Sequence, residues 1–145
     1  MQVLEKDAVL NLNPTLDFDW LAIAKQMGAI VGNRHVVRKR EELITYECDG
    51  LTSYHDLHRP RLVVLPQNTI EVAAIVKLCD QQQIPWIARG AGTGLSGGAV
   101  PDENCLLIGT ARMNKILNID LANQRVTVQP GVINNWVTQI GRAHV

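Results

Sequence analysis

Residues 89–98 hold five of the chain's eleven glycines and constrain the fold more than any other stretch. They follow the apolar run 84–88, which predicts a buried strand. Glycine is favoured where φ must be positive or where another group approaches the backbone closely. A dense run of glycines leaves many peptide N–H groups along one concave edge, an arrangement that binds phosphate. Hydroxyls of Thr93 and Ser96 and the charge of Arg89 strengthen the prediction of a pyrophosphate cradle for a nucleotide cofactor.

Three other interpretations of this stretch compete with the cradle. Residues 92–97 match the Rossmann pattern G-x-G-x-x-G, but residues 98–101 (Gly-Ala-Val-Pro) are poor material for the helix that the pattern requires. A Walker A loop needs Lys and then Ser or Thr after its last glycine, and Gly98 and Ala99 stand there instead. A flexible surface loop is the third alternative. It is disfavoured because a second apolar run, residues 105–108, follows so soon.

Composition excludes several classes of partner. Lys plus Arg and Asp plus Glu both number 14 in 145 residues, so neither nucleic acid nor a basic partner is indicated. The N-terminus has no apolar signal-peptide core, and no run approaches the roughly 20 apolar residues that span a bilayer. Cys48, Cys79 and Cys105 are odd in number and widely spaced, which suggests free thiols. We therefore expect a cytoplasmic protein, associated with a membrane only through partners.

Apolar periodicity predicts a helix over about 18–27, capped by Asp17 or Asp19 and ended by Gly28 or Gly32. A strand over 62–65, a helix from the cap Asn68 to about residue 83, and a strand over 86–88 form a βαβ unit. The second helix is expected to bury a stripe, of which only Lys77 is not apolar. The stripe consists of Ile70, Ala73, Ala74, Lys77 and Leu78.

A third strand is expected at 105–108, then a β-hairpin of 114–120 and 125–129, a break at Pro130-Gly131, and a helix from about residue 132. The basic run 34–40 is interpreted as a solvated face. The aperiodic stretch 45–57 is long enough to cover a site. His55 and His58, with Cys48 upstream, fit no standard zinc spacing, so we expect no metal.

Residues 89–99, RGAGTGLSGGA, resemble the FAD pyrophosphate loop of the FAD-linked oxidases of the vanillyl-alcohol oxidase and p-cresol methylhydroxylase (PCMH) type. Within that family they are most similar to FAD-binding subunits of glycolate oxidases and to D-lactate dehydrogenases. Three further segments agree in order and spacing, namely TYECDGL (45–51), RPRLVVLP (59–66) and VTVQPGV (126–132). The resemblance runs from about residue 45 to 139.

The resemblance implies an α+β fold with α/β-like character, the truncated N-terminal βαβ subdomain of a PCMH-type FAD-binding domain. It implies FAD as the cofactor, held by a cradle with Pro66 near the cofactor and Pro130 and Gly131 close to the flavin. The cradle consists of Arg89, Gly90, Ala91, Gly92, Thr93, Gly94, Leu95, Ser96, Gly97 and Gly98. We expect Gly94 and Gly97 to need positive φ and to lie against the phosphate.

The implied activity is oxidation of a 2-hydroxy acid such as glycolate or D-lactate, with companion subunits of a glycolate oxidase complex as partners. No catalytic residue is assigned, and His35, His55 and His58 are not assigned a covalent flavin. Two alternatives stay open: a non-redox nucleotide-binding module, and an FAD-dependent transferase of the same family.

The expected organisation is a helical extension (1–44), the first part of a PCMH-type FAD-binding domain (45–139) and a non-native tail (140–145). The tail matches one reading frame of a common sequencing-library adapter. We expect the fragment itself to be inactive.

Overall fold

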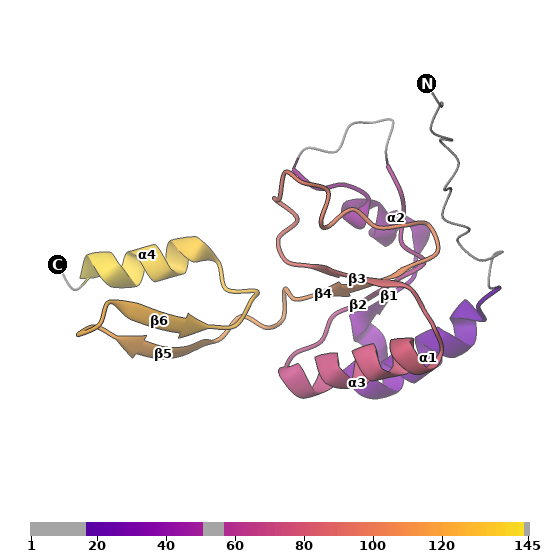
Figure 1. The fold of residues 1–145 in the computed structure, drawn as a ribbon, viewed down its shortest axis with the longest axis horizontal. Helices are drawn as coiled ribbons and strands as arrows, with labels where there is room; N and C mark the ends of the chain where they lie inside the picture. Colours follow the sequence, from indigo (N-terminus) through magenta and orange to yellow (C-terminus); the bar gives the residue numbers. More distant parts are fainter. Residues whose placement is uncertain (1–16, 51–56, 144–145) are drawn as a thin grey trace, which may run out of the picture.

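The computed structural model describes residues 17–50 and 57–143, which form a four-stranded sheet carrying helices and a separate hairpin with its own helix (Figure 1). The sheet order is β1-β2-β4-β3, in which β2, β4 and β3 run parallel and β1 is an antiparallel edge. The strands are β1 (Val36–Val37), β2 (Leu62–Val64), β3 (Trp86–Arg89) and β4 (Leu106–Gly109). The predicted α+β fold with α/β-like character is confirmed.

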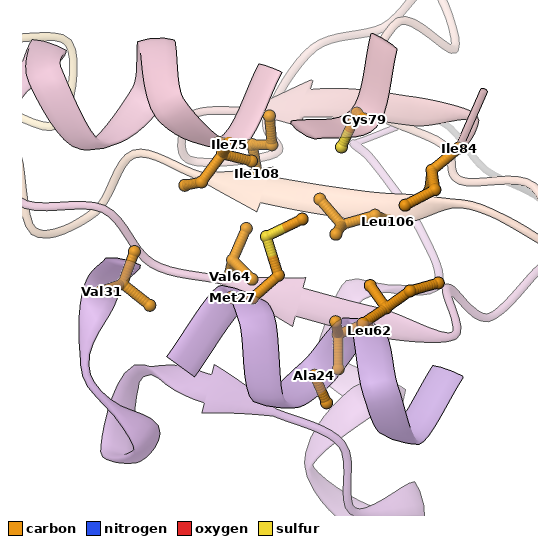
Figure 2. Close-up of a cluster of buried hydrophobic side chains, with 11 residues drawn as sticks. Ala24, Met27, Val31, Leu62, Val64, Ile75, Cys79, Ile84, Leu106 and Ile108 are labelled. Carbon is orange, nitrogen blue, oxygen red and sulfur yellow. The ribbon is translucent and has the colours of Figure 1, made fainter. Parts of the chain in front are cut away.

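Helix α1 (Trp20–Val31) lies between two of the predicted boundary residues, Asp19 and Gly32, and so begins and ends later than the predicted range 18–27. The Asp19 carboxylate accepts hydrogen bonds from the N–H groups of Leu21 and Ala22, so Asp19, not Asp17, is the N-cap. Gly32 ends the helix with φ +86°. Met27 of this helix is fully buried against the sheet (Figure 2).

Helix α3 (Thr69–Gln81) is capped as predicted, because the Asn68 side chain accepts from the Glu71 N–H. The predicted buried stripe is wrong. Ile70 is 82% exposed, whereas Ile75 and Cys79 are fully buried in the core shown in Figure 2. Ile75 and Cys79 are four residues apart, so they also share one helix face, and that face meets the sheet.

The parallel β2-α3-β3 unit is present, with β4 inserted between its two strands. Strand β3 therefore lies at the sheet edge. Trp86 is 44% exposed, so the expectation that 84–88 form a fully buried strand is wrong, although Ile84 itself is buried. A short helix, α2 (Arg40–Leu43), lies on the sheet face opposite α1 and α3 (Figure 1), where Leu43 packs with Val63 and Leu107.

The predicted hairpin consists of β5 (Ile116–Asp120) and β6 (Arg125–Val128), followed by α4 (Asn134–Ala143). These elements form an arm beside the main sheet (Figure 1). Two 3₁₀ turns, Asn33–His35 and Ile44–Tyr46, complete the described elements. Within the described ranges, every helix is too short or too polar to span a bilayer.

Candidate cofactor-binding site

The glycine loop, residues 89–98, leaves the carboxyl end of β3, the edge at which open α/β sheets bind ligands. Its first residue, Arg89, is buried and points beneath the loop. The Arg89 guanidinium donates to the Cys48 carbonyl oxygen at 2.6 Å and lies 5.8 Å from the centre of the Tyr46 ring. Arg89 therefore supports the loop from below.

The bracing segment, residues 46–50, runs along the glycine loop and holds it at two further points. The Gly97 N–H donates to the Asp49 carboxylate at 3.0 Å, and the Gly50 N–H donates to the Gly94 carbonyl oxygen at 3.0 Å. Glu47 is in turn ion-paired with Arg59. Sequence reasoning assigned a covering role to the aperiodic stretch 45–57, and residues 46–50 fit that expectation. Residues 51–56 lie outside the described part.

Positive φ occurs at two glycines of the loop, Gly92 (+72°) and Gly97 (+73°). A Cβ at Gly92 would collide with the Arg89 guanidinium, whereas a Cβ at Gly94 would meet nothing within 4 Å. The prediction of positive φ is therefore confirmed at Gly97 and wrong at Gly94. Gly92 is the second glycine whose conformation the loop requires.

The loop presents free backbone donors. In the described part of the chain, the N–H groups of residues 91–96 have no hydrogen-bond acceptor. The side chains of Thr93 and Ser96 are exposed beside them. Consecutive unpaired N–H groups at a strand end form an anion-binding concavity.

The loop cavity, about 460 Å³ in volume, joins the start of the glycine loop to the Pro130-Gly131 break. This volume lies within the range of about 300–1,000 Å³ that is usual for small-molecule sites. The cavity thus brings together four residues that the sequence placed near a cofactor: Gly90, Ala91, Pro130 and Gly131. Sequence reasoning missed the other lining residues, which are Ala111, Asn114, Val132, Ile133, Asn134 and Trp136.

Gly131 fits the cavity wall only because it lacks a side chain. Its N–H donates to the Met113 carbonyl oxygen at 2.8 Å, and a Cβ there would collide with the Thr110 carbonyl oxygen. The close approach of the 110–113 and 130–131 backbones fixes where the arm leaves the sheet.

Pro66 is fully buried and does not line the loop cavity. The residues on either side of it are held by Arg112, which donates to the Leu65 carbonyl oxygen at 2.6 Å and to Gln67 Oε1 at 3.0 Å. Partial burial, followed by the Arg112 and Arg34 charges, lowers the pKa of nearby His35, which favours the neutral imidazole.

The loop cavity and the glycine loop are suited to binding a ligand. The described residues that line the loop cavity contribute backbone, apolar side chains and two asparagines, and none of them is a general base or a nucleophile. Among the described residues, no cluster of three or more His, Cys, Asp or Glu side chains could hold a metal. Two of the side chains that the sequence offered as possible metal ligands, His55 and Asp56, lie outside the described part.

Comparison with known proteins agrees with a cofactor site. Residues 60–144 match the family model described as FAD binding domain. The chain is 41% identical over 128 residues to the glycolate oxidase subunit GlcD of Escherichia coli (strain K12), covering 88% of this chain and 25% of that protein. It is 46% identical over 81 residues to a D-lactate dehydrogenase of Anaerostipes hadrus, covering 56% of this chain and 17% of that protein.

The fold matches that of p-cresol methylhydroxylase, with a TM-score of 0.71 at 22% identity, over 84% of this chain and 25% of that one. The chain therefore spans a quarter or less of the length of these relatives. The predictions of the family and of FAD as the cofactor are confirmed: this chain belongs to the FAD binding domain family, with the fold of the PCMH-type oxidases.

Proposed function

We propose that this chain is the FAD-binding part of a flavin-dependent oxidoreductase that oxidises a 2-hydroxy acid. The observation that carries the proposal is the row of N–H groups at residues 91–96, which have no acceptor among the described residues and lie beside the loop cavity. The substrate class follows from the relatives, whose names specify glycolate and D-lactate, both 2-hydroxy acids.

The residues present fit FAD. The N–H groups of the glycine loop would hold the diphosphate with the Thr93 and Ser96 hydroxyls, while Arg89 adds positive charge from below. Pro130 and Gly131 would lie close to the flavin. Pro66 would contribute indirectly, because it is buried behind the site and fixes the backbone that Arg112 holds. When bound, FAD supplies the redox chemistry by accepting a hydride equivalent. The described residues supply placement and charge, and none is assigned as a catalytic base.

Two further features belong to the proposal. Residues 45–139 would form the first part of the FAD-binding domain, although α1 and β1, which precede residue 45, pack into the same core. The tail 140–145 would be non-native, which resequencing of the source DNA past the codon for Gln139 would decide.

Companion subunits would assemble with the protein, as the subunit designation of the glycolate oxidase relative suggests. A reducing cytoplasm is supported by three unpaired cysteines, of which Cys79 and Cys105 are buried.

The test is flavin retention by the full-length protein carrying Gly97→Val. Valine at φ +73° is strained and would displace the loop, so we expect the purified variant to lose its flavin. Thr127→Val is the matched control, because it introduces the same side chain at an exposed position of β6 outside the loop cavity. A Gly97→Val protein with normal flavin content would overturn the cradle assignment.

Anaerobic addition of glycolate or D-lactate should bleach the flavin of the unaltered protein, and a flavin that stays oxidised with every 2-hydroxy acid would overturn the activity.

A further inference from the structure

A second cavity, here the arginine cavity, lies at the amino end of β2 and has a volume of about 420 Å³. Its floor contains the buried residues Leu43 and Pro60. Its charged wall consists of Arg38, Arg40, Arg59, Arg61 and Glu103. Four positive charges and one negative charge therefore surround one cavity in a chain whose formal net charge is zero.

Strand pairing brings these arginines together. Val37 of β1 pairs with Val63 of β2 in antiparallel register, so the residues after β1 lie beside those before β2. Arg38 and Arg40 come from the first segment, and Arg59 and Arg61 from the second. The sequence suggested that the basic run 34–40 is a solvated face, but two of its arginines share a cavity with two distant ones.

The arginines are only partly neutralised. Arg59 is ion-paired with Glu47. Arg38, Arg40 and Arg61 have no carboxylate partner within the described ranges, although neighbouring Lys39 pairs with Glu42 at 3.6 Å. The positive charges of these arginines repel one another. A bound anion would attract each of them and so offset that repulsion.

We propose that the arginine cavity binds a small multivalent anion carrying phosphate or carboxylate groups. Guanidinium groups present paired N–H donors that match both kinds of group, which favours a compact oxyanion over a single chloride. The volume lies within the usual range for small ligands. The arginine cavity shares no lining residue with the loop cavity, so the anion is not the cofactor diphosphate.

Calorimetric titration of the full chain tests the site, with citrate and inorganic pyrophosphate as separate probes at constant ionic strength. We expect saturable binding of at least one probe, weakened at least tenfold by Arg61→Glu and by Arg38→Glu. Citrate alone binding would indicate a carboxylate ligand, and pyrophosphate alone a phosphate ligand. Both arginines are exposed, and the milder Arg61→Gln should weaken binding in the same direction if a charge reversal disturbs folding.

Two control variants locate the binding. Lys39→Glu changes an adjacent charge outside the cavity lining and should leave affinity unchanged within twofold. Gly97→Val alters the glycine loop and should leave citrate affinity unchanged. Absence of saturable binding by both probes would overturn the proposal, as would equal weakening by Lys39→Glu and Arg61→Glu. Binding of a hexaglutamate peptide but of neither small probe would instead make this surface a protein-docking site.

Discussion

At the scale of single residues, the glycines of the loop are not equivalent. Gly92 and Gly97 have positive φ, which a residue with a side chain adopts only with strain. Gly92 also packs directly over the Arg89 guanidinium. Gly90, Gly94 and Gly98 would each accept a Cβ without contact within 4 Å in the ligand-free chain.

Gly92→Ala should therefore destabilise the protein, whereas Gly94→Ala should not. A left-handed conformation costs a residue with a side chain about 1–2 kcal/mol, and displacing Arg89 adds to this. Denaturant unfolding of the flavin-free variants measures the difference. Equal stabilities of the two variants would contradict the positions described for these glycines.

Arg89→Met should lower the free energy of unfolding by about 2 kcal/mol, because the Cys48 carbonyl oxygen loses a charge-assisted hydrogen bond. Arg125→Met, at an exposed position of β6, is the control and should change stability by less than about 0.5 kcal/mol. Chemical denaturation compares the two. A change at Arg89 no larger than that at Arg125 would show that Arg89 does not brace the loop.

Sequence pattern identified the glycine loop because glycine density is a local signal. It did not identify which side chains contact the loop. Arg89 and Cys48 are 41 residues apart and Gly97 and Asp49 are 48 residues apart, and such pairs leave no periodicity in the sequence. The sequence pattern placed Gly131 near the candidate site, but the collision of a Cβ there with the Thr110 carbonyl oxygen depends on two segments meeting in space.

At the scale of elements, local chemistry determined where the helices begin. Asp19 and Asn68 both cap with their side chains, and both were predictable. The face that a helix buries could not be predicted in the same way. Helix α3 has two apolar faces, and packing against the sheet selects the one that carries Ile75 and Cys79. The edge strand β1, with two residues, is too short to show an alternating pattern.

Asp19→Ala should lower stability by roughly 1 kcal/mol, because two N–H groups of α1 lose their acceptor. Asp17→Ala removes the same side chain two residues earlier, where no capping bond forms, and should have little effect. Thermal unfolding distinguishes them, and a larger loss at Asp17 would assign the cap to the other aspartate.

The buried thiols report on the same packing. Burial raises the pKa of both Cys79 and Cys105 to about 11, from 9.0 for an exposed thiol. At pH 7.5 a thiol reagent should label half-buried Cys48 quickly and the other two only after unfolding. The folded state favours the neutral thiols over the thiolates. The stability that the neutral thiols contribute is therefore complete below pH 9 and is lost as the pH rises toward 11. Rapid labelling of Cys79 in the folded chain would contradict its place in the core.

At the scale of the whole molecule, the arm of β5, β6 and α4 lies beside the α/β body (Figure 1). The loop cavity is lined by residues of both parts. The body supplies Gly90 and Ala91, and the connection between β6 and α4 in the arm supplies Pro130 and Gly131. Glycine and proline marked both segments as candidates in the sequence, but the meeting of the two segments depends on the chain path between them. The arm also exposes large apolar side chains, among them Leu117 (59%) and Trp136 (42%), which accords with a chain spanning a quarter of its relatives' length.

The most direct test of the cradle is an amide ¹H–¹⁵N spectrum of the flavin-free full-length protein, recorded as FAD is added. The cradle predicts that the largest shifts fall on the N–H groups of residues 91–96, which have no acceptor within the described chain and would donate to the diphosphate. Unmoved signals at residues 91–96, together with large shifts elsewhere, would contradict the assignment of the glycine loop as the FAD cradle.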